Sequence, residues 1–156
     1  MDSVDYARAV DACGEMVFRL AFSYTACRAD AEDCCQEVFL KLYRVKTDFA
    51  DDEHIRAWLI TATRRQCIDL FRSFWKKRVT VTGELAAVRD EESRGVLESV
   101  MRLPKNQRDV VYLHYYEGYA VKELARMLGA GESAVKQRLN RGRQALKALL
   151  EQEDRI

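Results

Sequence analysis

Residues 121–147 read VKELARMLGAGESAVKQRLNRGRQALK. Apolar residues recur at helical intervals on either side of a glycine-containing turn, which predicts two helices, 121–128 and 132–147. The second helix has no acid after Glu132, and its cations are Lys136, Arg138, Arg141, Arg143 and Lys147. A helix-turn-helix with a cationic second helix is typical of a unit that enters the major groove of DNA. The alternative, a basic surface helix in a bundle, is disfavoured because turn, apolar faces and charge coincide.

The composition indicates a helical protein. Of the 156 residues 48% are hydrophobic, there is a single proline, Pro104, and helical periodicity runs through most of the sequence. We therefore expect an all-α fold of two small helical domains joined by a flexible linker, the C-terminal one a helix-turn-helix. The expected bounds are 1–78 for the first domain, 79–94 for the linker and 95–156 for the second domain.

The net charge of +1 conceals a division of charge along the chain. Residues 30–37 are mainly acidic, 53–78 basic and 83–98 acidic, and the helix at 132–147 is basic again. Two basic zones separated by an acidic stretch suggest two nucleic-acid contacts joined by a connector.

Cysteine and histidine usage argues against metal or disulfide chemistry. The five cysteines show no C-x-x-C spacing, and there are two histidines, so we expect no metal site and no cofactor. An enzyme using Cys34–Cys35 or His54 is disfavoured, because no nucleophile, base and orienting group stand in a recognisable set. No stretch is apolar enough to cross a bilayer, so we expect no membrane insertion and a cytoplasmic location with reduced thiols.

The spacing of apolar residues predicts which side of two helices in the first domain is buried. Asp30 can cap a helix whose buried stripe consists of Ala31, Cys34, Val38, Phe39 and Leu42. A basic helix follows at about 54–75, and its expected apolar contacts are Ile55, Leu59, Ala62, Ile68, Phe71 and Trp75. Cys34 and Cys67 fall on apolar faces, and each is most simply a small buried residue.

Taken in order, the motifs of the chain resemble those of bacterial sigma factors. The stretch DAEDCCQEVFL at 30–40 resembles the family's D-A-E-D-x-x-Q-E-V-F signature, and AWL at 57–59, followed by Asp69, resembles the pattern after it. Three later stretches resemble motifs of the family's promoter-binding domain: LPKNQR at 103–108, YEG at 116–118 and VKQRL at 135–139. The resemblance covers nearly the whole chain, and the lack of further domains points to the extracytoplasmic-function (ECF) class.

The resemblance implies a transcription initiation factor without catalysis of its own. Its expected partners are core RNA polymerase, through the clamp helices of the largest subunit and the flap, promoter DNA, and an anti-sigma factor. The polymerase-binding positions that it implies are Asp33, Gln36, Glu37 and Leu40. Carboxylates and an amide beside an apolar residue suit a basic protein surface, whereas the alternative is a merely solvated face. An apolar surface at Phe39, Leu40 and Tyr43 is a hypothetical docking place for the anti-sigma factor.

The first domain is expected to melt the minus-10 element of the promoter. The residues assigned to it are Arg56, Trp58, Arg64, Arg65, Arg72 and Lys76. Melting needs planar groups that capture unstacked bases, and cations that hold the displaced strand. Trp58 has two interpretations: it is either a core residue or a planar group on which an unstacked base stacks. Arg65 stands where the family usually has asparagine, so the base read there is left open.

The second domain is expected to read the minus-35 element. The residues assigned to it are Ser133, Lys136, Gln137, Arg138, Asn140 and Arg141. Gln137 and Asn140 have the chemistry to read adenine, and Lys136 and Arg141 that to contact guanine or phosphate. Ser133 and Arg138 are assigned as phosphate clamps.

Several further points stay open from the sequence. The acidic residues at 84–92 suit either a solvated tether or a mimic of nucleic acid in the polymerase channel. His114 has two interpretations, a DNA-backbone contact or a plain surface residue. The runner-up function is a stand-alone helix-turn-helix regulator, which would need a ligand-binding or dimerisation domain in the first half.

Overall fold

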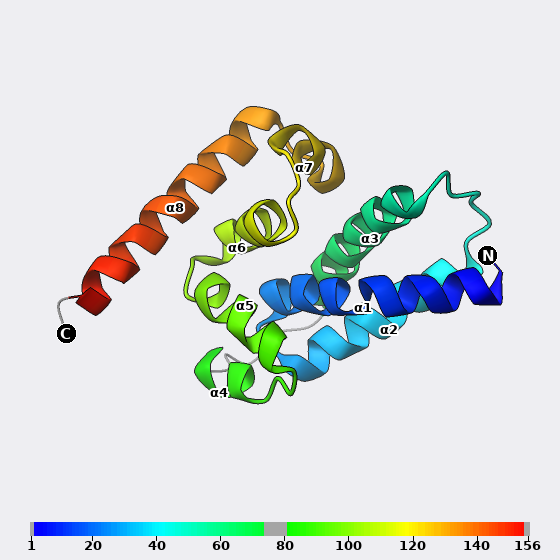
Figure 1. The fold of residues 1–156 in the computed structure, drawn as a ribbon, viewed down its shortest axis with the longest axis horizontal. Helices are drawn as coiled ribbons and strands as arrows, with labels where there is room; N and C mark the ends of the chain where they lie inside the picture. Colours follow the sequence, from blue (N-terminus) through cyan, green and yellow to red (C-terminus); the bar gives the residue numbers. More distant parts are fainter. Residues whose placement is uncertain (1, 74–80, 155–156) are drawn as a thin grey trace. The chain divides into compact units, whose positions relative to one another are not determined.

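The computed structural model describes residues 2–73 and 81–154, and every regular element within these ranges is a helix. The chain divides into two compact units, Met1–Arg89 and Asp90–Ile156 (Figure 1). The prediction of an all-α fold with two small helical domains is confirmed. No helix in the described part is long and apolar enough to cross a membrane.

The first unit is built on three helices, α1 (Ser3–Thr25), α2 (Arg28–Arg44) and α3 (Asp52–Ser73). Each packs against the other two, because each has an apolar stripe at helical spacing. Side chains with no exposed surface fill the space between them: Val17, Leu20, Phe22, Val38, Leu42, Leu59 and Ile60. A short helix, α4 (Val81–Ala86), belongs to the same unit.

The cysteines of the first unit are reduced, and the two expected to be buried are buried. Cys34 on α2 and Cys67 on α3 meet with their sulfurs 3.6 Å apart. The predicted burial of both residues is therefore confirmed.

The second unit contains α5 (Glu91–Met101), α6 (Lys105–Val111), a π-helix (Tyr112–Tyr116), α7 (Val121–Leu128) and α8 (Glu132–Asp154). Asp90 caps α5, because its Oδ2 accepts hydrogen bonds from the Ser93 backbone N–H at 3.1 Å and from the Ser93 hydroxyl at 2.7 Å. Pro104 directly precedes α6, as expected for a residue without a backbone donor. Leu97, Leu113, Leu124, Leu128, Val135 and Leu139 form much of the core.

The helix-turn-helix has the predicted bounds at its first helix and a longer second helix. Gly129 ends α7 in the left-handed region, at φ 63°, which glycine adopts without steric cost. The Ala130 backbone N–H then donates to the Ala125 carbonyl at 3.0 Å, which closes the turn. Beyond it α8 runs to residue 154 and not to 147, since its helical periodicity continues past the motif.

Three other elements differ from the expected bounds. Asp30 does not cap α2, because the helix begins at Arg28, with Cys27 at its N-cap and Asp30 within its first turn. The basic helix expected at 54–75 is α3, which occupies 52–73, and Trp75 lies outside the described residues. Within the expected linker at 79–94, residues 81–86 form α4 and residue 91 starts α5, whereas 79 and 80 lie outside the described part. The acidic residues of this segment are thus partly helical.

Candidate functional site

The second helix of the helix-turn-helix, α8, has a sharply two-sided character. Val135, Leu139 and Gly142 are buried against the rest of the unit. The exposed side carries all but one of the residues assigned to the minus-35 element: Ser133, Lys136, Gln137, Asn140 and Arg141. Packing with α6 and α7 therefore leaves this polar face of α8 open to a partner.

Arg138 is the residue that departs from this arrangement. Its side chain is only 24% exposed, and its guanidinium forms an ion pair with Asp109 of α6, a residue that is itself buried. Arg138 Nε also donates to the Asn106 carbonyl oxygen at 2.6 Å. These contacts hold α8 against α6, so the structure gives Arg138 a role inside the unit that the sequence analysis did not foresee.

Gly142 brings α8 unusually close to α6. A Cβ atom on this residue would lie 2.6 Å from Val111 Cγ2, inside the contact distance of two carbon atoms. Glycine is thus needed here for close approach rather than for a special backbone angle. The sequence analysis did not single out Gly142, and only its position on the apolar side of the helix could have signalled it.

The segment before α7 is held by hydrogen bonds that side chains make with the backbone and with one another. His114 Nδ1 lies 2.7 Å from the Tyr119 carbonyl oxygen, and the Tyr112 hydroxyl donates to Glu117 at 2.6 Å. The Ala120 backbone N–H donates to the Glu123 carboxylate at 3.3 Å and so starts α7. His114 therefore has a partner within the chain. The sequence analysis had considered a DNA-backbone contact and a plain surface residue, but not this contact.

In the first unit, α2 presents the acidic and apolar face that the sequence predicts. Asp33, Gln36, Glu37 and Leu40 are all exposed, and Leu40 keeps 43% of its surface. The opposite stripe of α2 is buried: Ala31, Cys34, Val38, Phe39 and Leu42.

The apolar surface expected at Phe39, Leu40 and Tyr43 is smaller than supposed. Phe39 is buried in the helical core and cannot contribute, which corrects that hypothesis. Tyr43 is 56% exposed, and its ring lies edge-on to Tyr6 of α1, with ring centres 5.2 Å apart. The exposed apolar residues of this face are therefore Leu40 and Tyr43.

The residues assigned to the minus-10 element are spread along α3. Arg65 is exposed, whereas Arg64 and Trp58 are half-buried. The Trp58 ring makes an edge contact with Phe49, with ring centres 6.1 Å apart, so it is neither a full core residue nor fully accessible. The side chain of Arg72 and all of Lys76 lie outside what the structure describes.

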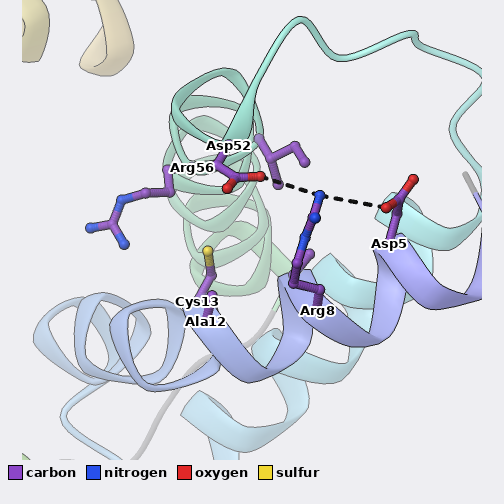
Figure 2. A pocket seen from close by; sticks show the side chains of 8 residues that line it. Asp5, Arg8, Ala12, Cys13, Asp52 and Arg56 are labelled. Atoms are coloured by element: carbon purple, nitrogen blue, oxygen red, sulfur yellow. Dashed lines mark ion pairs between the residues drawn. The ribbon is translucent and has the colours of Figure 1, made fainter.

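Arg56 lies at the rim of a small cleft between α1 and α3 (Figure 2). At the exposed edge of the cleft Arg8 forms ion pairs with Asp5 at 3.4 Å and with Asp52 at 3.5 Å. The Arg56 guanidinium extends away from these pairs (Figure 2), and Arg56 itself is half-buried. Arg56 is therefore not tied up in the ion pairs of the cleft.

The remaining candidates for chemistry are the thiols. Burial raises the pKa of the Cys35 thiol to about 12, and burial also raises the pKa of Cys27. Both thiols therefore stay protonated near neutral pH, and a protonated thiol is a poor nucleophile. Within residues 2–73 and 81–154, no group of three or more potential metal ligands comes together.

Comparison with known families accounts for both units. Residues 9–77 match the family model of sigma-70 region 2, and residues 93–146 match that of sigma-70 region 4. These ranges fall within the two structural units and include the exposed faces of α2 and α8.

Two curated relatives give the same result. The probable RNA polymerase sigma factor RfaY of Xanthomonas campestris pv. campestris is 30% identical over 155 residues, covering 88% of this chain but 38% of that protein. The chain thus spans well under half the length of this relative. The ECF RNA polymerase sigma factor SigM of Bacillus subtilis is 31% identical over 144 residues, covering 85% of this chain and 87% of that protein.

Two solved structures share the fold. The sigma factor RpoE of Bartonella quintana, in complex with the anti-sigma factor NepR, has a TM-score of 0.71 at 19% identity, covering 94% of this chain and 97% of that chain. CnrH, in complex with the cytosolic domain of CnrY, has a TM-score of 0.68 at 26% identity, covering 96% and 90%. The chain therefore belongs to the sigma-70 family of RNA polymerase sigma factors, in its ECF class.

Proposed function

We propose that the chain is a transcription initiation factor that binds core RNA polymerase and directs it to specific promoters. The observation that carries this proposal is the pairing of two outward faces in one chain: the cationic face of α8 and the acidic, partly apolar face of α2. A cationic helix in a helix-turn-helix suits DNA, and an acidic face with an exposed leucine suits a basic protein surface. A sigma factor needs both kinds of contact.

The exposed face of α2 is the proposed polymerase contact. Glu37 and Asp33 supply negative charge, Gln36 supplies an amide, and Leu40 supplies apolar surface that is otherwise open to water. Their proposed partner is the clamp-helix region of the largest subunit, and a further contact of the chain is proposed with the flap. The buried stripe on the other side of α2 fixes the orientation of this face.

The exposed face of α8 is the proposed reader of the minus-35 element. Lys136, Gln137, Asn140 and Arg141 reach base edges or phosphates, and Ser133 is a phosphate contact near the start of the helix. Arg138 acts in this proposal as a positioning residue, because its ion pair with Asp109 holds α8 at a set angle on α6.

α3 is the proposed site of minus-10 melting. The residues proposed for it are distributed around and along the helix: Arg56, Trp58, Arg64 and Arg65, with Arg72 and Lys76 further along the sequence. Arginines hold the displaced strand through its phosphates, while aromatic rings stack on unpaired bases. The proposal does not assign which base is captured beside Arg65.

An anti-sigma factor is proposed as a regulatory partner. The solved structures that share the fold, those of RpoE and CnrH, each contain a second protein in complex. In this chain Leu40 is part of the proposed polymerase face, and the exposed Tyr43 follows three residues later on α2, so a protein bound to this apolar pair would exclude polymerase. Leu40→Asp is expected to weaken capture of such a protein, which a pull-down from the host can measure.

Run-off transcription tests the proposed function. Purified core polymerase, the full chain and a library of host promoter fragments are combined, with Glu37→Lys as a variant impaired in polymerase binding. Specific transcripts that require the wild-type chain, and fall with the variant, are the expected result. Operator-like DNA binding by the chain alone, without any transcript, would favour the stand-alone regulator instead.

A further inference from the structure

One stripe along α8 places cations on both sides of Asn140. Lys136, Asn140, Arg143 and Lys147 follow at spacings of four, three and four residues, so they lie on one side of the helix. All of them are exposed. The helical neighbours of Asn140 are thus two cations, Lys136 and Arg143, and two amides, Gln137 and Gln144.

Arg143 sets the orientation of that amide. Its Nη2 donates a hydrogen bond to Asn140 Oδ1. A guanidinium has donors and no acceptor, so the amide oxygen is the end of Asn140 that can face it. The Nδ2 group, with its two donor hydrogens, is directed to the other side of the amide. Asn140 and Arg143 together thus present mainly donors.

That arrangement discriminates between the two purines. Reading adenine with two hydrogen bonds requires an asparagine to accept from N6 and donate to N7. Oδ1 has a second lone pair, but an adenine amino group that reached it would lie beside the Arg143 guanidinium, so donor hydrogens would face donors and a positive charge. Guanine offers acceptors at both N7 and O6, which match the donors of the pair.

We propose that Arg143 is a specificity-determining residue, which turns Asn140 from an adenine reader into a reader of guanine in the minus-35 element. This inference rests on the proposed function of the chain. It replaces the adenine assignment made from the sequence, which treated the Asn140 amide as independent of its neighbours. Arg143 was absent from the residues assigned to DNA on sequence grounds.

The test is a promoter selection with the full chain and core polymerase. The minus-35 element is randomised at every position, and the enriched sequences are compared between wild type, Asn140→Ala, Arg143→Met and Lys147→Met. Methionine keeps side-chain length and helix propensity while removing the cation. Lys147→Met is the matched control, because it removes a cation from the same stripe one turn further along. Circular dichroism verifies that each variant is folded.

Asn140→Ala identifies the base pair that Asn140 faces: it is the minus-35 position at which this variant loses the base preference of the wild-type chain. At that position the wild-type chain is expected to prefer guanine. Arg143→Met should lower the guanine-to-adenine ratio there at least about fivefold. Lys147→Met should lower the yield of all sequences alike, because it removes a phosphate-type contact.

Three results would overturn the inference while leaving promoter selection intact. They are adenine preference of the wild-type chain at the Asn140 position, an unchanged purine ratio in Arg143→Met, and no position that responds to Asn140→Ala. If the wild-type chain enriches no promoter at all, the proposed function itself fails and the inference fails with it. That case is recognisable because the wild-type chain and all variants behave alike.

Discussion

α2 in the first unit and α8 in the second are built in the same way and present opposite chemistry. Each buries an apolar stripe against two neighbouring helices and leaves the other side exposed. The exposed side of α2 carries Asp33, Glu37 and Leu40, and that of α8 carries Lys136 and Arg141. The comparison teaches that packing determines which side of such a helix is available, whereas its charge determines which partner suits it.

The two helices differ in how they are anchored. The buried stripe of α2 is apolar throughout and includes the contact between Cys34 and Cys67. α8 instead approaches α6 closely at Gly142 and is flanked by the ion pair of Arg138 with Asp109. A cation in the recognition helix is therefore not automatically a DNA contact, and the predictions below separate the two roles.

The largest effect is expected for Arg138→Met, which removes the counter-charge of the buried Asp109 carboxylate. An unbalanced buried charge costs about 3–5 kcal/mol, so the second unit should lose stability while the first unit keeps it. Hydrogen exchange followed by mass spectrometry measures the two units separately. The double variant Arg138→Met with Asp109→Leu should recover most of the loss. Unchanged protection of α6 and α8 in the single variant would show that the ion pair is dispensable.

The next effect is expected for Arg141→Ala, on the exposed side of the same helix. Loss of a base contact should weaken discrimination between a cognate promoter and a mutated minus-35 element by about 1–3 kcal/mol, without loss of stability. Competition binding with the polymerase holoenzyme measures this. Arg126→Ala, an exposed arginine on α7, is the control and should change discrimination little. Equal effects of the two variants would place Arg141 among general phosphate contacts.

On α2, Glu37→Lys should weaken association with core polymerase about tenfold, because it reverses a charge that faces a basic partner. The fold should be unaffected, since Glu37 is exposed. Titration of labelled core polymerase gives the affinity. Asp11→Lys, at an exposed acid of α1, makes a similar charge reversal elsewhere in the unit and serves as the control. Wild-type affinity of Glu37→Lys would contradict the assignment of this face.

The smallest effect is expected for Gly142→Ala. Its new Cβ would crowd Val111 Cγ2, and overpacking of this kind costs about 1–3 kcal/mol, of which the better helix propensity of alanine offsets about 1 kcal/mol. Thermal unfolding should show a lowered midpoint for the second unit. At Gly95 on α5 a Cβ meets no atom within 4 Å, so Gly95→Ala should be stabilising. A stabilising Gly142→Ala would mean that α8 can move away from α6 at little cost.

Local patterns were enough to predict much of the architecture. The first helix of the helix-turn-helix was expected at 121–128 and occupies Val121–Leu128. The buried stripe of α2 was also predicted residue by residue. These features are readable because helical periodicity is a property of neighbouring residues, and burial of an apolar stripe follows from it wherever a core exists.

Other features depended on groups far apart in the sequence. The sequence analysis assigned Arg138 to DNA as a phosphate clamp, but its guanidinium pairs with Asp109 on α6. Phe39 was assigned both to the buried stripe of α2 and to an exposed apolar surface, and the structure places it in the core.

The sequence by itself therefore determined most of the helices, their two-sided character and the signs of charge on their exposed faces. Only the tertiary structure decided which of those charges hold the protein together and which are left for a partner. The physical reason is that a side chain's role depends on the groups packed against it. Those groups, such as Asp109 beside Arg138 and Val111 beside Gly142, come from a helix that the periodicity of α8 does not specify.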